Sequence, residues 1–146
     1  MRVIPTRLAG LLVIEPDIHR DARGFFMEIH HARRYQDAGI REHFVQDNLS
    51  FSLRGTLRGL HFQIRRPQAK LVQAIQGEVF DVAVDLRAGS PTFGAWEGVR
   101  LDQASGRQLL VPAGFAHGFS VLSATAVFLY KCSDFYDPQD EGGLLW

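Results

Sequence analysis

Five side chains that can carry acid–base chemistry occur in stretches that otherwise have the pattern of apolar strands. They are Arg58, His61, Lys70, His117 and Tyr130. A histidine titrates near neutral pH and can act as a general base, a tyrosine hydroxyl can deliver a proton, and a lysine ammonium can stabilise an oxyanion inside a cavity. Because buried charges are costly unless they are paired, we expect these side chains to converge on one polar cavity.

Each of these residues also has a purely structural interpretation. A core histidine satisfied by one hydrogen bond, a solvated lysine at the start of an edge strand and a tethered core tyrosine are all common in proteins. His117 follows a Pro-x-Gly-x-x-His turn and is open to the same interpretation. For His61, the nearby Arg58 and Lys70 favour the functional interpretation.

A metal site is the next possibility to test. The pattern Pro112-x-Gly114-x-x-His117 resembles the second motif of the cupin superfamily, whose jelly-roll barrels often hold a metal. The first cupin motif requires a His-x-His pair followed by a glutamate, but the stretch here is His61-Phe62-Gln63 and the next glutamate is Glu78. Two histidines and a glutamine fall short of three strong ligands for zinc or iron, so we predict no metal site.

Alternating apolar and polar residues predict the strands that hold these side chains. The clearest alternation runs over residues 79–87, where one face is apolar and the other carries Asp81, Asp85 and Arg87. A face with two carboxylates and a guanidinium is expected to line a wet cavity. Further expected elements are strands over residues 57–63, 70–76 and 125–131 and a short helix over residues 31–38, ended by Gly39.

The strand over residues 57–63 needs an irregularity if it is to serve one cavity. Arg58 and His61 would point to opposite faces of a regular strand, because side chains alternate along it. Gly59 lies between them and can host a β-bulge that turns one of the two side chains. We therefore expect a bulge at this glycine.

Composition indicates one globular domain. The 146 residues are 46% hydrophobic and 22% charged, and 14 glycines and 6 prolines separate short segments without any linker. We expect a single all-β domain over residues 1–146, a sandwich or barrel with one minor helix. Its core is expected to include Phe25, Phe26, Phe115 and Phe119.

The charge balance and the cysteine content limit the kinds of binding partner and the cellular compartment that fit this sequence. The 16 acidic and 16 basic residues balance, which argues against a nucleic-acid partner or an anionic membrane surface. No apolar run approaches the roughly 20 residues that span a bilayer. The single cysteine, Cys132, excludes a disulfide framework and favours a cytoplasmic, reducing compartment.

Several motifs in order along the chain resemble the dTDP-4-dehydrorhamnose 3,5-epimerases. These motifs are Gln46-Asp47-Asn48-Leu49-Ser50, residues 57–63, residues 68–72, residues 81–87, residues 90–94, residues 112–119 and Leu129-Tyr130-Lys131. The resemblance covers roughly residues 13–146, and a series of ordered motifs is far more specific than any one of them. It implies a metal-free, cupin-type jelly-roll barrel that forms a homodimer.

The resemblance also implies a substrate and a reaction. The substrate would be a dTDP-4-keto-6-deoxyhexose, a dTDP-sugar whose C-3 and C-5 flank a ketone and are inverted through an enolate, without a cofactor. His61 would remove the α-proton, Tyr130 would return a proton on the opposite face, and Lys70 would stabilise the enolate oxygen. The alternatives are a 3-epimerase or 3,4-ketoisomerase of the same fold, a metal-dependent cupin enzyme, and a non-catalytic sugar-nucleotide binder.

Substrate-binding residues follow from the same resemblance. They are Arg23, Glu28, Gln46, Asp47, Asn48, Arg58, His117, Tyr136 and Glu141. The arginines suit a diphosphate and Tyr136 would stack on the thymine. Family members run some tens of residues past the tryptophan that matches Trp146, and that tail supplies a lysine and an aspartate paired with the catalytic histidine. Within residues 1–146, Asp81 and Asp85 are the carboxylates expected to orient His61.

Overall fold

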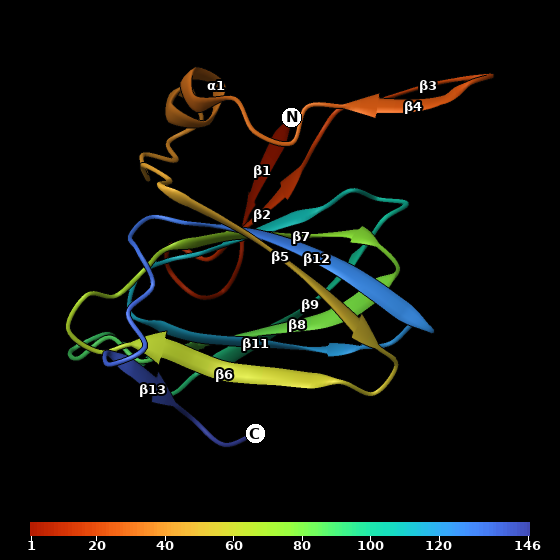
Figure 1. The fold of residues 1–146 in the computed structure, drawn as a ribbon. Coiled ribbons are helices and arrows are strands. Elements are labelled where there is room, and N and C mark those ends of the chain that lie inside the picture. Colours follow the sequence, from red (N-terminus) through yellow and green to blue (C-terminus); the bar gives the residue numbers. More distant parts are fainter.

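Two antiparallel sheets face each other in the computed structural model, which describes residues 1–146 (Figure 1). One sheet has six strands in the order β1-β2-β10-β7-β12-β5, and the other has five in the order β13-β6-β11-β8-β9. Strands β3 and β4 form a separate hairpin. The all-β class with one minor helix is confirmed, and two facing antiparallel sheets are the architecture of a jelly roll.

The bounds of the elements are as follows. The strands are β1 (Arg2–Pro5), β2 (Leu12–Glu15), β3 (Ile18–Asp21), β4 (Gly24–Met27), β5 (Gln46–Leu53), β6 (Leu57–Gln63), β7 (Lys70–Gln76), β8 (Glu78–Asp85), β9 (Trp96–Asp102), β10 (Gln108–Val111), β11 (Phe115–Val121), β12 (Thr125–Cys132) and β13 (Glu141–Gly143), and the helix is α1 (Ala32–Asp37). The strands expected over residues 57–63 and 70–76 are confirmed as β6 and β7, and the one over residues 125–131 is one residue longer.

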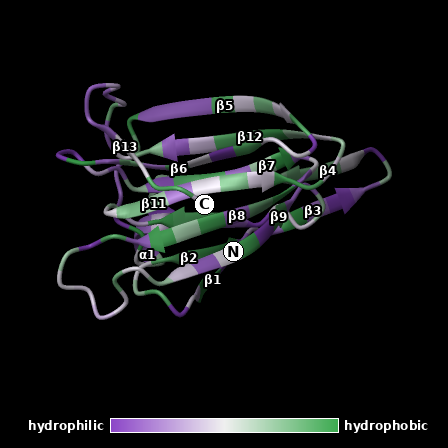
Figure 2. Ribbon diagram, turned by 90° about the horizontal axis from the view of Figure 1, so that it is seen from below, coloured by the Kyte–Doolittle hydropathy of each residue, from purple (hydrophilic) through white to green (hydrophobic).

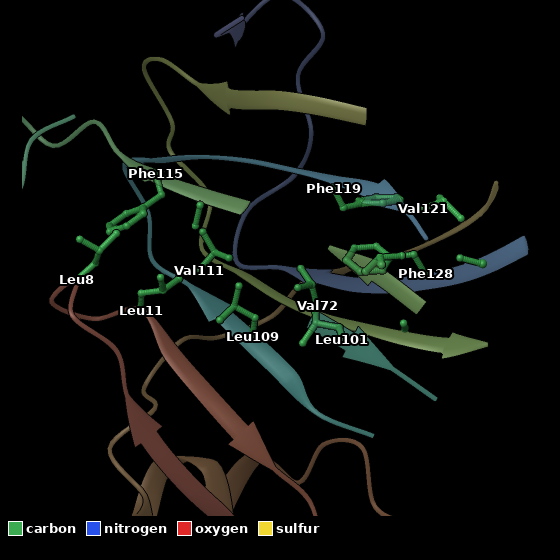
Figure 3. Close-up of a cluster of buried hydrophobic side chains, with 14 residues drawn as sticks. Leu8, Leu11, Val72, Leu101, Leu109, Val111, Phe115, Phe119, Val121 and Phe128 are labelled. Carbon is green, nitrogen blue, oxygen red and sulfur yellow. The ribbon is translucent and has the colours of Figure 1, made fainter. Parts of the chain in front are cut away.

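The main core lies between the two sheets, where inward side chains of both interdigitate (Figure 3). Phe128 of β12 packs against Phe119 of β11, with ring centroids 4.2 Å apart. Val72 of β7 and Leu101 of β9 are completely buried in the same cluster. The apolar positions of the alternating strands therefore supply the hydrophobic stabilisation that holds the sheets together.

Helix α1 confirms the expected short helix and its stop. His31 is the N-cap and its side chain accepts a hydrogen bond from the Arg34 N–H. Gly39 follows the helix with a φ of +91°, a left-handed conformation that glycine adopts without a Cβ penalty.

Strand β8 corrects the expectation of a face that lines a wet cavity. Its inward face carries Val79 and Ala83 into the main core, and both carboxylates on that face are completely buried. Asp85 is the last residue of the strand, and its carboxylate accepts hydrogen bonds from the Arg87 guanidinium and the Ser90 hydroxyl of the following turn. The strand ends at this residue, two positions earlier than predicted, because its carboxylate organises the turn instead of a cavity wall.

The hairpin β3–β4 projects away from the two sheets (Figure 1). Phe25 and Phe26 are therefore 47% and 70% exposed, and the prediction that they belong to the core is wrong. A two-stranded hairpin has no second layer of its own to cover its aromatic side chains. Phe115 and Phe119 are buried, as predicted.

No helix in the structure has both the length and the apolar character needed to cross a membrane.

Candidate active site

A cavity of about 590 Å³ opens between the two sheets. Its walls come from β5, β7 and β12 of one sheet and from β6, β11 and β13 of the other. The lining residues are Ser50, Leu57, Arg58, Gly59, His61, Lys70, His117, Gly118, Phe119, Phe128, Tyr130, Tyr136 and Glu141. A smaller cavity of about 170 Å³ adjoins it and shares His61, Lys70, Tyr130, Tyr136 and Glu141. The predicted convergence of the acid–base side chains on one cavity is thus what the fold produces.

The irregularity at Gly59 brings Arg58 and His61 onto the same cavity. His61 pairs with His117 and Arg58 pairs with Phe119, so two residues of β6 stand opposite the single residue Gly118. Gly59 has a φ of +88°, and a Cβ there would lie 2.5 Å from the His117 carbonyl oxygen, which only glycine avoids. The expected bulge is confirmed.

Arg58 is held by the strand that faces it. Its Nε donates a hydrogen bond to the Ser52 hydroxyl on β5 at 2.9 Å. The hydrophilic first half of β5 and the alternating pattern of its second half are visible in Figure 2. Because Ser52 engages one side of the guanidinium, part of the remaining donor fork is available to a ligand in the cavity.

Tyr130 and Lys70 come from neighbouring strands of the six-stranded sheet. Tyr130 pairs with Asn48 of β5, and Lys70 pairs with Cys132 of β12. Burial raises the pKa of the Tyr130 hydroxyl above 10.0, so this group keeps its proton at neutral pH. Burial lowers the pKa of the Lys70 ammonium below 10.5, an effect that Glu141 and Asp81 partly offset.

Glu141 is the carboxylate nearest His61. Strand β13 runs beside β6, and Glu141 Oε1 lies 3.2 Å from His61 Nδ1. The other carboxylate oxygen accepts a hydrogen bond from the Tyr136 hydroxyl. His61 itself is 56% exposed, so its Nε2 side has room for a substrate.

Asp81 and Asp85 do not contact His61, which corrects the expected carboxylate partner. Asp81 instead accepts from His117 Nε2, at 2.9 Å to each carboxylate oxygen, and both residues are buried. Burial raises the pKa of the Asp81 carboxyl, and the neighbouring His117 opposes that rise. The prediction failed because β11 lies between β8 and β6. Asp81 of β8 is therefore next to His117 of β11 and is separated from His61 of β6.

Three of the predicted binding residues line neither cavity. Arg23, on the β3–β4 hairpin, forms an ion pair with Asp21 and is otherwise exposed. Glu28 forms an ion pair with Arg34 at 2.8 Å. Asp47 points away from the cavity and pairs with Lys131, because it alternates with the inward-facing residues of β5. The other predicted binding residues, Gln46, Asn48, Arg58, His117, Tyr136 and Glu141, each line at least one of the two cavities.

The cavities also contain polar groups that were not predicted as site residues. Ser50 Oγ lines the larger cavity, is buried and has no hydrogen-bond partner. Gln68 and Cys132 line the smaller one. The sequence signal that could have found Ser50 is the alternation along β5. Ser50 follows Asn48 by two residues, so both side chains point to the same face of the strand.

The residues present do not form a metal-ligand set. No group of three or more His, Cys, Asp or Glu side chains lies close enough together to hold an ion. Gln63, which occupies the position of the second histidine of the cupin motif, donates its amide to the Arg66 carbonyl and accepts from the Asp137 N–H. Because these backbone contacts use both ends of the amide, this side chain is not free to act as a ligand.

Comparisons with known proteins agree on one family. A family model described as dTDP-4-dehydrorhamnose 3,5-epimerase matches residues 5–146. A protein of that name from Pseudomonas aeruginosa is 56% identical over 144 residues, which cover 97% of this chain and 80% of the relative. A dTDP-4-dehydrorhamnose 3-epimerase from Streptomyces niveus is 44% identical over 146 residues, which cover 99% of this chain and 70% of the relative.

Solved structures give the same result. The crystal structure of a dTDP-6-deoxy-D-glucose-3,5-epimerase from Legionella pneumophila, in complex with dTDP-4-keto-L-rhamnose, superposes with a TM-score of 0.95. The two sequences are 54% identical, and the match covers 98% of this chain and 77% of that one.

Proposed function

The chain belongs to the dTDP-4-dehydrorhamnose 3,5-epimerase family, and from this premise we propose how its side chains carry out the reaction. The enzyme inverts C-3 and C-5 of dTDP-4-keto-6-deoxyglucose to give dTDP-4-keto-L-rhamnose. Both carbons flank the C-4 ketone, so loss of either proton produces an enolate. The protein must supply a base on one face of the sugar ring, an acid on the other and a positive charge beside the C-4 oxygen.

The observation that carries this proposal is that His61 and Tyr130 reach the same cavity from different sheets. His61 comes from β6 of the five-stranded sheet and Tyr130 from β12 of the six-stranded sheet. A sugar ring held between the sheets would therefore meet the imidazole on one side and the phenol on the other. Inversion requires this arrangement, because the proton must leave from one face and return to the opposite one.

Lys70 is suited to stabilise the enolate oxygen. It is partly buried at the start of β7, where it lines both cavities. A positive charge acts more strongly on a developing oxyanion where water is excluded. Lys70 pairs with Cys132 on β12, two residues from Tyr130, which places it along the same wall as the proposed acid.

The nucleotide would be held by groups at the rim and on β5. The guanidinium of Arg58 is proposed to clamp the diphosphate, because an arginine fork matches two phosphate oxygens. Tyr136, which is half exposed at the rim, presents its ring for stacking on the thymine. The side-chain amides of Gln46 and Asn48, which bond to each other at 3.0 Å, would contact the remaining polar groups of the substrate.

Incubation with dTDP-4-keto-6-deoxyglucose in D₂O tests the function, with NMR and mass spectrometry of the sugar as readouts. Deuterium at both C-3 and C-5, in a product of rhamno configuration, is the expected result. Deuterium at C-3 alone would assign the chain to the 3-epimerases, the activity named for the relative from Streptomyces niveus. If neither C-3 nor C-5 exchanged its proton, the result would contradict catalysis and leave a binding role.

The alkaline limb of the pH profile should report Lys70. The ammonium is the active form. Because its pKa is lowered, kcat/KM should decline as the pH rises and Lys70 loses its proton, and the midpoint of this decline should lie at a pH lower than 10.5. In Lys70→Arg the guanidinium keeps its charge beyond pH 12, so the residual activity should fall only at higher pH. Lys131→Arg is the matched control and should leave the limb unchanged. An unshifted limb in Lys70→Arg would mean that another group sets it.

Glu141 is proposed to orient His61 by facing its Nδ1. Glu141→Gln keeps the shape but removes the charge that supports the imidazolium formed during proton abstraction. We expect kcat to fall about tenfold with KM little changed, as measured by steady-state kinetics. Glu97→Gln, on β9, is the control. A raised KM with unchanged kcat would assign Glu141 to substrate binding alone.

We further propose that the protein is a homodimer and that its β3–β4 hairpin lies against the partner. This would explain why Arg23 lies outside its own cavity and why Phe25 and Phe26 are exposed. In the dimer the arginine would reach the diphosphate in the neighbouring chain. Light scattering on the purified protein measures the mass that this arrangement requires.

A cytoplasmic location is also proposed. The only cysteine, Cys132, is buried as a free thiol, which suits a reducing compartment.

A further inference from the structure

The bulge at Gly59 is held from outside the cavity by an aromatic side chain. Trp146 Nε1 donates a hydrogen bond to the Gly59 carbonyl oxygen at 2.7 Å. This carbonyl belongs to the two-residue side of the bulge, where a strand cannot complete its regular ladder with the neighbouring strand. The indole N–H thus supplies a donor at the position where β6 is irregular.

The indole ring fits the bulge because both facing residues are glycines. A Cβ on Gly118 would lie 3.0 Å from Trp146 Cζ2 and 2.3 Å from the Arg58 carbonyl oxygen. A Cβ on Gly59 would lie 2.8 Å from the Gly118 Cα. The ring therefore lies against bare backbone, on the outer face of the five-stranded sheet.

The rest of the indole is anchored on that outer face. Trp146 lines an apolar groove of about 330 Å³ together with Leu60, Val82, Val84 and Trp96. The neighbouring backbone adds a second attachment, because the Leu144 N–H donates to the Leu60 carbonyl at 3.0 Å. The segment after β13 thus contacts β6 at two consecutive carbonyls, Gly59 and Leu60.

We propose that Trp146 is a positioning residue for the reaction: by holding the Gly59 carbonyl it fixes the bulge that aims Arg58 and His61 into one cavity. Arg58 precedes the held carbonyl, and His61 follows it by two residues. Without the indole donor the backbone at Gly59 would be free to relax toward a regular ladder, in which the two side chains point to opposite faces. The inference rests on the proposed roles of Arg58 and His61.

Trp146→Phe keeps an aromatic ring against Gly118 and removes the N–H donor, and Trp146→Leu is a second variant that also lacks the donor. We expect kcat to fall about tenfold, and the dissociation constant of dTDP, measured by titration calorimetry, to rise about fivefold. Trp96→Phe, which alters the same apolar groove without touching Gly59, is the matched control and should change both values less than twofold. Thermal unfolding identifies the variants that are folded at the assay temperature.

A double-mutant cycle with His61→Asn separates positioning from general stability. If Trp146 acts through His61, adding Trp146→Phe to His61→Asn should lower the residual kcat by less than twofold. A full further tenfold loss would overturn the proposal, as would wild-type kcat and dTDP affinity in Trp146→Phe. If the unaltered enzyme itself did not exchange protons, the proposed function would fail, whereas dTDP titration would still test the bulge.

Discussion

His61→Asn should lower kcat by about 10²-fold or more, the size of effect that follows loss of a general base. Asparagine preserves a polar side chain of similar reach but cannot accept the α-proton. The imidazole lines both cavities, and Glu141 Oε1 faces its Nδ1 at 3.2 Å, which leaves Nε2 as the proton acceptor. Both inversion and deuterium exchange at C-3 and C-5 should be lost together, because neither occurs without enolate formation.

The matched control for this variant is His43→Asn, an exposed histidine that lines neither cavity. It should retain wild-type turnover and exchange. Titration with dTDP should show that His61→Asn still binds the nucleotide, since the groups proposed to hold the diphosphate and the thymine ring are unchanged. Turnover of His61→Asn within threefold of the wild type would remove His61 from the role of base.

Tyr130→Phe should separate proton removal from inversion. Loss of the phenol should lower the rate of inversion by about 10²-fold or more, because no acid remains on that face of the ring. His61 can still form the enolate and return a deuteron from its own side. The substrate recovered from D₂O should therefore carry deuterium in the original configuration, which NMR detects directly.

Tyr35→Phe provides the control for removing a buried phenol. The Tyr35 hydroxyl donates to Gln108 Oε1 at 2.6 Å and lies 3.1 Å from the Ile29 carbonyl oxygen. Tyr35 lines neither cavity, and burial raises its pKa to about 12. Its loss should reduce thermal stability but leave turnover intact. If Tyr130→Phe lost deuterium exchange as well as inversion, Tyr130 would be needed for enolate formation. Its role would then not be limited to returning the proton.

Local sequence pattern was sufficient where the structure depends on neighbours along the chain. The alternation over residues 125–131 correctly placed Phe128 and Tyr130 on one inward face of β12. The glycine between Arg58 and His61 correctly predicted the bulge, because only glycine tolerates the φ of +88° found there. The resemblance of ordered motifs led to the same family as the comparisons.

Contacts between distant segments were not predictable in this way. His61 is faced by Glu141, which is 80 residues away in sequence and reaches it because β13 pairs with β6. Asp81 had the right chemistry, but β11 lies between β8 and β6, so His117 takes the carboxylate. Burial alone did not discriminate between the carboxylates, since Asp85 is also completely buried and serves a turn.

The sequence by itself therefore determined the all-β class, the inward face of β12 and the convergence of His61, Lys70 and Tyr130 on one cavity, because these follow from side-chain alternation and residue type. Only the tertiary structure decided which carboxylate faces His61, that Asp47 and the β3–β4 hairpin lie outside the cavity, and that Trp146 donates a hydrogen bond to the Gly59 carbonyl. The physical reason is strand order: hydrogen-bonded pairing places residues from remote parts of the chain side by side, and no local pattern specifies which strands become neighbours.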